Sequence, residues 1–586
     1  MPHAVGLITT LAAGFGLALV FGFIAARLKL PALVGYLVAG IAIGPATPGF
    51  VADAEIAAQL AEIGVMLLMF GVGLQFSIDD LLAVRKIALP GAVVQMVVAT
   101  ALGARVATLW GWAIGAALVF GLALSVASTV VLLKALEARG IVDSANGRIA
   151  VGWLVVEDLA MVLMLVLLPA LAPSLGGSAP ADSGARSTGM TILVTLAQVG
   201  GFIAFMLIVG RRLFPWVLWH VTKTGSRELF TLCVVAAAVS IAYGSAALFG
   251  VSFALGAFFA GMVLRESEFS QRAAEQTLPL QDAFAVLFFV SVGMLFEPSV
   301  LVEQPLRVLA TVAIIVLGKS FAAALLVMVL RYPLKTAVTV SASLAQIGEF
   351  SFILAGLGMS LGLLPKEGQS LILAGALISI AINPLVFGLA EPLQRWLSRW
   401  PAIARRLDPA ESPLVELPTT TEARYLSNQV VLVGWGRVGK QLAKQLSAEG
   451  VPFVVAEENR EAVQALRDSG VPAVWGDATE PAVLIQAHIR DAKALVIATP
   501  ETLHVRKMAE IARALNPGIR IVVRGHNAQE AELLESEGAG TVFVGETELA
   551  NAMLRHVMGI VKNEPAAPSS AAPRHPPRPA PAPAPH

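Results

Sequence analysis

Two adjacent acidic residues, Glu157 and Asp158, stand in a stretch that otherwise has the composition of a membrane helix. Gly152–Val156 precedes the pair and Leu159–Pro169 follows it. A rise of about 1.5 Å per residue from Arg148 places the pair roughly 14–15 Å into the stretch, near the middle of a hydrocarbon layer of about 30 Å. Carboxylates at that depth are costly unless they face water, a cation or a partner. The pair therefore predicts a cation or proton site.

The helical period separates the two carboxylates. Neighbouring positions on a helix differ by about 100°, so Glu157 and Asp158 can border one cavity but cannot share one contact. The alternative is a different helix boundary, which would leave the pair in a loop. The apolar residues on both sides favour a continuous helix through the pair.

The composition divides the chain into a membrane part and a remainder. Hydrophobic residues make up 56% of the 586 residues and charged residues only 14%, and the apolar excess lies in 1–400. A formal net charge of zero gives no indication of a nucleic-acid partner. The single cysteine, Cys233, excludes an intramolecular disulfide and a CxxC site. Since the N-terminus lacks a basic n-region, Val5–Ala26 is expected to remain as the first span.

Thirteen apolar stretches are expected to cross the lipid bilayer. They are 5–26, 32–45, 55–76, 88–109, 113–134, 148–171, 190–210, 229–244, 247–264, 282–297, 306–330, 335–361 and 367–391. Several are short or broken by Gly and Pro, and the second is too short to cross without tilt or protein cover.

The basic residues between these stretches predict the orientation. With the N-terminus outside, nineteen Lys and Arg residues fall in inside segments and four fall outside. The four outside are Arg105, Arg186, Arg307 and Lys366. The positive-inside rule therefore predicts an outside N-terminus and a cytoplasmic C-terminal region.

Small polar residues interrupt two of the expected spans. Ser125, Ser128 and Thr129 stand at mid-membrane depth in the fifth. Such hydroxyl groups either bond back to the preceding helical turn or mark an interrupted helix whose freed backbone groups line a cavity. A comparable segment of the twelfth span carries Ser341, Ser343, Gln346, Gly348 and Glu349.

A lysine, Lys319, lies deep in the expected span 306–330. An ammonium group at that depth needs an anion or loses its proton. Snorkelling to the membrane surface is the alternative, but either interface is on the order of ten residues away. We therefore expect Lys319 to be the partner of an acidic group or of a helix end.

Two interrupted segments in different halves of the chain, each beside a span with a buried charge, are the pattern of inverted-repeat transporters. Opposed half-helix ends bring partial charges of both signs to one depth, and Lys319 and the acidic residues can offset them. This pattern predicts an ion-coupled carrier, without choosing between K⁺ and Na⁺ as the ion exchanged for H⁺. The candidate ion- and proton-binding residues are Asp158, Glu157, Lys319, Ser128, Thr129, Gln346 and Glu349.

Five motifs follow one another in the membrane part. They are Gly35–Pro45, Leu67–Gln75, Gly256–Val263, Leu287–Pro298 and Gln346–Ser351. Together they resemble the monovalent cation:proton antiporter-2 family, and in particular its YbaL/RosB-like branch, over roughly residues 5–560. The resemblance implies a core of crossed, interrupted helices, a dimerising set of spans, and elevator-like exchange of a monovalent cation for protons. It places the family's membrane carboxylate at Asp158, preceded by Glu157 where Kef potassium systems have glutamine.

A glycine-rich turn marks a second site. Gln429–Gly434 reads as a buried strand, and the GxGxxG sequence Gly434–Gly439 follows it and opens a helix. In this context the glycines allow a phosphate to approach a helix N-terminus. Glu457 ends the stretch Phe453–Glu457, 23 residues past Gly434. It is placed to bind ribose hydroxyls, with a helix-cap role as the alternative.

Further expected strands complete a Rossmann-like α/β domain: Ala473–Trp475, Ala494–Ile497, Ile521–Val523 and Thr541–Phe543. The domain resembles the nucleotide-binding RCK N (TrkA-N) domain, and AMP or NAD(H) is the expected regulatory ligand. Asp477 could reach the base or ribose, or could cap a helix. The candidate nucleotide-binding residues are Gly434, Gly436, Arg437, Val438, Gly439, Glu457, Asp477, Ala478 and Thr499.

We therefore expect a polytopic α-helical exchanger domain over 1–391, a linker over 392–427, a Rossmann-like domain over 428–562, and a disordered Pro/Ala-rich tail over 563–586. The expected protein is a homodimeric antiporter and not an enzyme. A nucleotide-gated cation channel is one alternative, although no TVGYG-like filter occurs. A membrane-tethered oxidoreductase is another, although no dehydrogenase substrate domain accompanies the glycine-rich turn.

Overall fold

The chain forms two compact units in the computed structural model, residues 1–409 and 410–586. The structure describes residues 3–48, 50–75, 78–139, 141–142, 144–178, 188–267, 269–330, 332–397, 414, 416–418, 421–499, 502–525 and 527–561. Much of the linker expected over 392–427, and the whole tail expected over 563–586, lie outside the described residues.

The first unit consists of helices. They are α1 (His3–Arg27), α2 (Ala32–Ile43), α3 (Ala54–Gln75), α4 (Ile78–Leu109), α5 (Ile114–Ser125), α6 (Thr129–Glu137), α7 (Ala145–Leu171), η1 (Ala172–Leu175), α8 (Thr188–Phe205), η2 (Met206–Gly210), α9 (Arg211–Thr222), α10 (Arg227–Phe249), α11 (Phe253–Arg265), α12 (Ser270–Met294), α13 (Val300–Glu303), α14 (Pro305–Ala313), η3 (Ile314–Gly318), α15 (Lys319–Val329), α16 (Leu334–Leu344), α17 (Glu349–Ser360) and α18 (Lys366–Leu397).

These helices account for every expected span. Within the described residues, ten helical elements are long and apolar enough to cross a membrane, and the bent pair α16–α17 makes an eleventh. The shorter apolar helices α2 and α11 bring the number of elements to thirteen. Each of the thirteen stretches expected from the sequence contains one of them, so the polytopic helical fold is confirmed.

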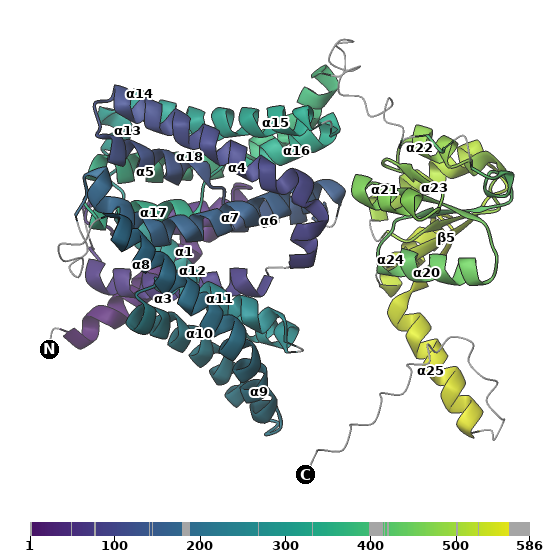
Figure 1. Cartoon of the computed structure of the whole chain (residues 1–586), viewed down its shortest axis with the longest axis horizontal. Coiled ribbons are helices and arrows are strands. Elements are labelled where there is room, and N and C mark those ends of the chain that lie inside the picture. The colour runs from purple at the N-terminus through teal and green to yellow at the C-terminus, as the bar shows by residue number, and fades with distance from the viewer. Residues whose placement is uncertain are drawn as a thin grey trace. The chain divides into compact units, whose positions relative to one another are not determined.

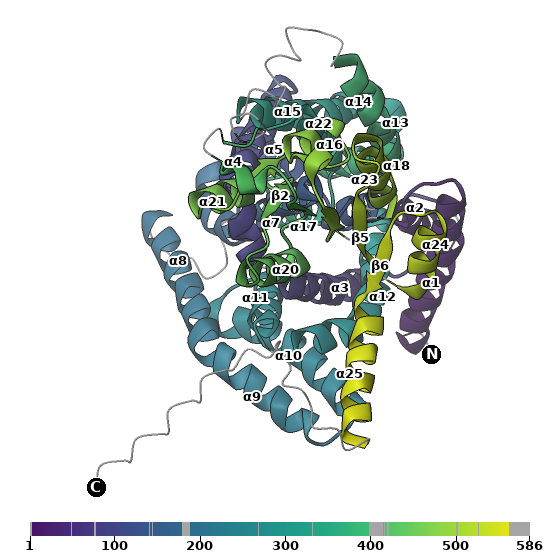
Figure 2. The same cartoon turned by 90° about the vertical axis from the view of Figure 1, so that its right-hand side faces the viewer.

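The helices pack as two bundles. We call α1–α3 and α10–α12 the scaffold bundle, and α4–α7 with α13–α18 the core bundle, because the helices within each set pack mainly on one another. In Figure 1 the core helices α14, α15 and α18 lie above the scaffold helices α3, α10 and α11. Helices α8 and α9 connect the bundles along the side of the unit opposite α1 and α2 (Figure 2).

The two halves of this unit repeat one order of elements. Both α1–α7 and α10–α18 run as a long helix, a short helix, two long helices, a broken helix and a long helix. Six helical elements before α10 are long and apolar enough to cross a membrane, and the short apolar helix α2 makes a seventh element. An odd number of elements inverts the second half relative to the first. This arrangement confirms the inverted repeats predicted from the sequence.

Equivalent helix contacts recur in the two repeats. Helices α2 and α12 meet at Gly40 and Gly293, whereas α11 and α3 meet at Gly261 and Gly73. A Cβ atom at any of these four positions would stand only 2.0–2.2 Å from a backbone oxygen of the facing helix. The scaffold bundle therefore contains two equivalent glycine contacts. In each, the short helix of one repeat packs on the third helix of the other repeat.

Each repeat contributes one broken helix to the core bundle. The first runs as α5 to Ser125 and resumes as α6 at Thr129. The second runs as α16 to Leu344, resumes as α17 at Glu349 and bends by 44°. The predicted interruption of the helix is thus confirmed. The alternative, a hydrogen bond to the preceding turn, also holds for Ser125, whose Oγ donates to the Leu122 carbonyl oxygen at 2.7 Å.

The two breaks touch each other. A Cβ atom added to Gly348 would stand 2.2 Å from Cβ and 2.6 Å from Cα of Ser128. Such distances lie far inside van der Waals contact, so only glycine allows the two broken helices to cross at this separation.

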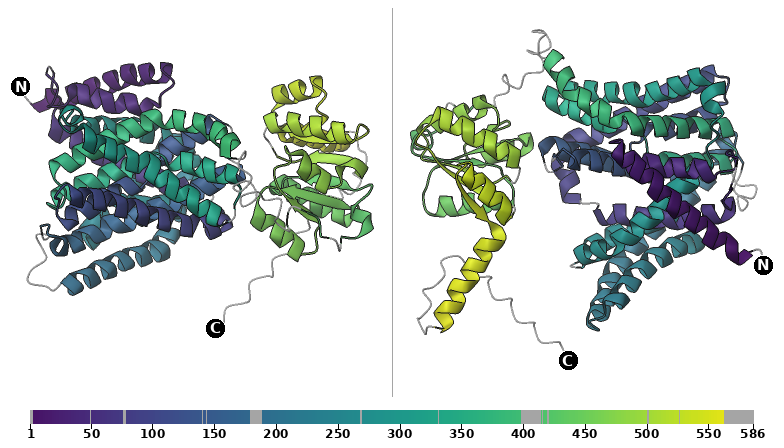
Figure 3. Two further views of the ribbon diagram at one scale, coloured as in Figure 1. Left: turned by 90° about the horizontal axis from the view of Figure 1, so that it is seen from above. Right: turned by 180° about the vertical axis from the view of Figure 1, so that it is seen from behind.

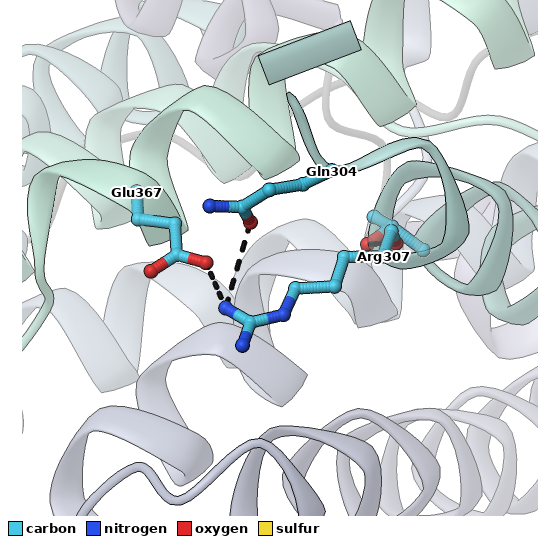
Figure 4. Close-up of polar contacts among 4 residues, drawn as sticks. Gln304, Arg307 and Glu367 are labelled. Carbon is cyan, nitrogen blue, oxygen red and sulfur yellow. Dashed lines mark hydrogen bonds and ion pairs between the residues drawn. The ribbon is translucent and has the colours of Figure 1, made fainter. Parts of the chain in front are cut away.

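An ion pair links α14 and α18 at one end of the core bundle. Arg307 of α14 pairs with Glu367 of α18 and donates a hydrogen bond to Gln304 (Figure 4). The guanidinium carbon also lies 5.3 Å from the centroid of the Trp110 ring, at the end of α4. This contact therefore holds three core helices together rather than joining the two bundles.

The second unit is a six-stranded sheet with helices on both faces. The strands are β1 (Val430–Val433), β2 (Phe453–Glu457), β3 (Ala473–Trp475), β4 (Ala494–Ile497), β5 (Arg520–Gly525) and β6 (Thr541–Val544). The helices are η5 (Ala423–Tyr425), α20 (Arg437–Ala448), α21 (Arg460–Asp468), α22 (Pro481–Gln486), η6 (Ile489–Asp491), α23 (Thr502–Leu515), α24 (Ala528–Ser536) and α25 (Gly545–Val561).

The strand order of this sheet fixes where a ligand can bind. All neighbouring strands are parallel, in the order β3-β2-β1-β4-β5-β6. Residues of α20 and α21 join the core on one face, and residues of α22, α23 and α24 join the core on the other. The order reverses between β1 and β4, and open α/β sheets bind ligands at such a switch point. The Rossmann-like domain predicted from the sequence is therefore confirmed.

Part of the expected linker is packed on the edge of this sheet. The Leu414 carbonyl oxygen accepts hydrogen bonds from the Trp475 backbone N–H, at 2.8 Å, and from Arg467, at 2.9 Å. Arg467 also donates to the carbonyl oxygen of Ala473, at 2.9 Å. Burial lowers the pKa of the Arg467 guanidinium from its ordinary value. The chain therefore meets the sheet at Trp475, the last residue of β3.

The contact between the breaks generates a prediction. Gly348→Ala should lower the stability of the protein by about 1–3 kcal/mol or more, because the new methyl group overlaps Ser128. Gly356→Ala on the same helix is the control, since a Cβ atom there meets nothing within 4 Å. The thermal midpoint of both variants in detergent would check this, and equal midpoints would contradict the crossing described here.

Candidate functional site

A glutamine side chain joins the two breaks. The Gln346 Oε1 atom accepts a hydrogen bond from the Ser128 backbone N–H, at 2.9 Å, and Nε2 donates to the Ser128 carbonyl oxygen, at 3.1 Å. Both residues are buried. A buried backbone group without a partner is costly in a membrane. Gln346 of one repeat therefore satisfies the backbone that the break in the other repeat leaves free.

Two carboxylates accept hydrogen bonds from hydroxyl groups of the first break. Thr129 Oγ1 donates to Asp158 Oδ2 at 2.9 Å, and Ser128 Oγ donates to Glu349 Oε2 at 2.8 Å. Both carboxylates are buried, and they are close enough to interact electrostatically. The structure thus brings together Asp158 of α7 and Glu349, the first residue of α17.

Glu157 and Lys319 lie at the same crossing. The Ala127 backbone N–H donates to Glu157 Oε2 at 2.8 Å, and Lys319 Nζ donates to the Gln346 carbonyl oxygen at 3.0 Å. Glu157 and Lys319 also interact electrostatically. Both side chains are fully buried, so Lys319 does not snorkel to a membrane surface. As the helical period requires, Glu157 and Asp158 have different partners at the same break.

Each of the three carboxylates has one oxygen without a hydrogen-bond partner among the described residues. These atoms are Glu157 Oε1, Asp158 Oδ1 and Glu349 Oε1. Buried polar atoms are normally paired, so unpaired carboxylate oxygens indicate room for a proton or a cation. Within the described residues no group of three His, Cys, Asp or Glu side chains has the geometry of a metal centre.

Two buried amides that the sequence did not single out hold the ends of the half-helices. Gln95 of α4 donates to the Ser125 carbonyl oxygen at 2.9 Å, and Asn383 of α18 donates to the Ala342 carbonyl oxygen at 3.0 Å. Gln95 Oε1 in turn accepts from the Trp153 indole N–H at 3.4 Å. A lone amide in an apolar span was the only sequence signal, since polar groups within spans usually face the protein interior.

The second unit forms the glycine-rich turn as expected. Gly434 has a φ of +94°, which permits the tight turn after β1. A Cβ atom on Gly439 would stand 2.1 Å from the Gly434 carbonyl oxygen, so the helix packs closely on the strand. A Cβ atom on Gly436 would meet nothing within 4 Å, which leaves open space before α20 begins at Arg437. These are the three glycine roles of a dinucleotide-binding turn.

Glu457 lies directly beside this turn. Its Oε2 atom accepts a hydrogen bond from the Trp435 backbone N–H at 2.6 Å, and its Oε1 atom accepts from the Asn459 backbone N–H at 2.8 Å. The side chain of Asn459 caps the following helix. The alternative that Glu457 is a helix cap is therefore wrong.

The remaining nucleotide candidates follow β4 and β3 or begin α20, at the same edge of the sheet. Thr499 follows β4 and packs against Gly434, and its buried Oγ1 atom has no hydrogen-bond partner among the described residues. Asp477 follows β3 and accepts hydrogen bonds from the N–H and hydroxyl groups of Thr479. The N-cap position of the next helix is Glu480, and the backbone N–H that Asp477 binds belongs to Thr479, before that helix begins, so Asp477 is not its cap. Ala478 is buried, whereas Arg437 and Val438 are exposed at the start of α20.

Crossed, broken helices with buried carboxylates, followed by a Rossmann-like domain, define an ion exchanger with a nucleotide-binding domain. The family described as "Sodium/hydrogen exchanger, transmembrane" matches residues 15–390, and the TrkA-N domain matches residues 430–545. The chain belongs to the sodium/hydrogen exchanger family. It is a multi-pass cation/proton antiporter with a regulatory TrkA-N domain and not an enzyme, so the channel and oxidoreductase alternatives are wrong.

Two relatives and one solved structure support this assignment. YbaL of Escherichia coli (strain K12), which is assigned as a cation/proton antiporter, is 51% identical over 94% of this chain and 98% of its own. KefB of Alkalimonas amylolytica, assigned as a K⁺ efflux antiporter, is 30% identical over 92% of this chain and 79% of its own. The sodium/proton antiporter MjNhaP1 of Methanocaldococcus jannaschii shares the fold, with a TM-score of 0.53 and 16% identity over 66% of this chain and 98% of its own.

The buried charges generate a prediction about stability. Glu157→Gln and Lys319→Met should each destabilise the protein, because each leaves the other group buried without the opposite charge with which it interacts. The double variant should lose clearly less than the sum of the two losses. Unfolding midpoints in detergent measure this coupling.

A second double variant is the control for the coupling between Glu157 and Lys319. Glu303 belongs to α13, outside the crossing, so Glu303→Gln combined with Lys319→Met should give additive effects. If the losses for Glu157→Gln and Lys319→Met were also additive, that result would contradict an electrostatic interaction between the two side chains.

Proposed function

We propose that this antiporter exchanges K⁺ or Na⁺ for H⁺ at Asp158. The observation that carries the proposal is a buried carboxylate with one oxygen on Thr129 and the other without a partner, at the crossing of two broken helices. A carboxylate holds a proton when neutral and a cation when ionised. Competition between the two ligands for one group couples their movements.

The other residues of the crossing have supporting roles in this proposal. Glu349, Ser128 and Thr129 provide oxygen atoms near Asp158 for a partly dehydrated cation. Gln346 keeps the crossing closed, while Glu157 and Lys319 set the local charge. Because all of them lie in the core bundle, movement of this bundle past the scaffold would carry the site across the membrane as one piece.

We place the N-terminus outside and the TrkA-N domain in the cytoplasm of a bacterial inner membrane. The distribution of nineteen inside and four outside basic residues supports this orientation. It exposes the regulatory domain to cytoplasmic nucleotides.

AMP or NAD(H) is the regulatory ligand that we assign to the second unit. The open space at Gly436, the carboxylate of Glu457 and the unpaired hydroxyl of Thr499 surround the switch point of the sheet. Asp477 and Ala478 follow β3, the edge strand next to β2. Leu414 of the linker is hydrogen-bonded to the same strand. A nucleotide that binds two states of the antiporter unequally shifts their balance.

A homodimer is the assembly that we assign to the chain. Helix α25, drawn in yellow in Figure 3, extends from the sheet. Its exposed large apolar side chains are Leu549, Met553, Leu554, Val557, Met558 and Ile560. A lone helix of this length is marginally stable in water, and a second copy of the same apolar face would cover it symmetrically.

The proposed ion site is tested by Asp158→Asn. In everted membrane vesicles, cation addition should drive proton movement through the wild-type protein and not through the variant, since an amide cannot exchange a proton for a cation. Glu303→Gln, outside the crossing, should keep wild-type exchange. Equal membrane levels of the three proteins must be measured, and cation-dependent proton flux retained by the Asn variant would overturn the proposal.

The proposed regulation is tested by Gly436→Asp. The added side chain crowds and charges the phosphate position, so AMP and NAD(H) binding to the purified whole chain should fall at least tenfold, or about 1.4 kcal/mol. Exchange should continue but no longer respond to nucleotide. Gly518→Asp provides a control, because a Cβ atom on Gly518 would meet its nearest neighbour at the ordinary distance of 3.7 Å, and Gly518 precedes β5 at the opposite end of the strands. A wild-type response from the Gly436 variant would contradict the assignment.

A further inference from the structure

A short segment ahead of the first strand of the second unit crosses the edge of the sheet. We call Leu414 and 416–418 the strap. The Leu414 side chain is buried in the core on the α20–α21 face of the sheet, whereas Leu417 packs against the core on the α22–α24 face. Strand β3 lies at the end of the strand order, so it is the edge strand that the strap meets. The strap therefore passes over this edge from one face of the sheet to the other.

Two elements of the domain hold the strap by its backbone. The Leu414 carbonyl oxygen accepts hydrogen bonds from the backbone N–H of Trp475, at 2.8 Å, and from Arg467, at 2.9 Å. Arg467 of α21 also donates to the Glu416 carbonyl oxygen and, at 2.9 Å, to that of Ala473 in β3. An edge strand presents unpaired N–H and C=O groups with which another segment can pair. Here a segment of the same chain pairs with them, and one arginine joins it to the strand.

The same two elements carry residues of the proposed nucleotide site. Helix α21, which contains Arg467, begins shortly after Glu457. Strand β3 ends at Trp475, and Asp477 follows it. The Trp475 indole N–H donates to the Glu458 carbonyl oxygen at 2.9 Å and so connects the end of β3 with the residues that precede α21. A bound nucleotide and the strap would therefore each bridge α21 and β3.

We propose that nucleotide binding and docking of the strap reinforce each other. Whichever of the two forms first restricts α21 and β3, so the other loses less conformational freedom when it follows. The coupling is reciprocal: the factor by which nucleotide stabilises the docked strap equals the factor by which the docked strap raises nucleotide affinity. This coupling rests on the nucleotide site proposed above, whereas the docking of the strap does not.

Docking of the strap sets the length of the connection between the two units. Residues 398–413 link the end of α18 to the docked strap. When the strap is released, the connection extends to Tyr425, which packs against the core on the α22–α24 face. The reach of a chain grows with its number of residues, and α18 belongs to the core bundle. A nucleotide that keeps the strap docked therefore restricts the proposed movement of the core bundle and slows cation/proton exchange.

The backbone N–H of Trp475 reports the docking of the strap. Its hydrogen–deuterium exchange in the purified whole chain should slow about threefold or more when AMP or NAD(H) is added to saturation. The Val430 N–H, which bonds to the Pro452 carbonyl oxygen at the other end of the strands, is the internal reference and should not change. Gly436→Asp should remove the slowing. Nucleotide binding without a change at Trp475 would overturn the coupling and leave the nucleotide site standing, whereas a wild type that binds neither nucleotide would overturn both.

Two variants release the strap from its two sides. Arg467→Met removes a donor to two strap carbonyl groups, and Leu414→Asp puts a charge where the core holds an apolar side chain. Each should speed hydrogen exchange at Trp475 about tenfold or more and raise the dissociation constant for nucleotide about threefold or more, while Val430 stays protected. Arg490→Met is the control, because Arg490 is exposed on η6 ahead of β4, and two strands separate β4 from β3. Unchanged exchange at Trp475 in both variants would overturn the strap, and unchanged nucleotide affinity would overturn the coupling.

Ion transport measures the consequence of docking. In everted membrane vesicles, nucleotide should slow cation/proton exchange by the wild type and by Arg490→Met. Arg467→Met and Leu414→Asp should exchange ions as the nucleotide-free wild type does and should respond much less to the same nucleotide concentration. A full nucleotide response from both released variants would overturn the role of the strap in regulation.

Discussion

The contact between two broken helices is the constraint on which the membrane unit depends. Breaking a helix within a membrane exposes backbone groups that neither lipid nor water can satisfy there. In this protein the backbone of Ser128 is satisfied by the side chain of Gln346 from the opposite repeat. These hydrogen bonds between the repeats are possible because Gly348 has no side chain and lets the two breaks approach closely. The amides of Gln95 and Asn383 hold one carbonyl group near the end of each first half-helix.

The same contact determines where charge can be buried. The break supplies N–H and hydroxyl donors to Glu157, Asp158 and Glu349, and Lys319 supplies the positive charge. These groups come from four helices of one bundle, so the site is a rigid part of that bundle. The proposed movement of the core bundle would carry the ion site within it.

The sequence was informative wherever a residue was out of place in its surroundings. Acidic residues and a lysine in apolar spans, and glycines after a buried strand, predicted the helix breaks and the sheet and placed the candidate residues. The roles of Gln95 and Asn383 could not be predicted, because a single amide in a span does not reveal its hydrogen-bond partner on another helix. The division into bundles and the packing of Leu414 on the sheet depend on contacts between distant segments. No local pattern encodes such contacts.

The central claim is that a cation and a proton compete for Asp158. The most direct test is to add K⁺ or Na⁺ to the purified protein in weakly buffered solution and to measure both the cation bound and the protons released. Competition predicts that cation binding releases protons, that acidification weakens cation binding, and that Asp158→Asn releases none. Cation binding without proton release from the wild type would contradict the account.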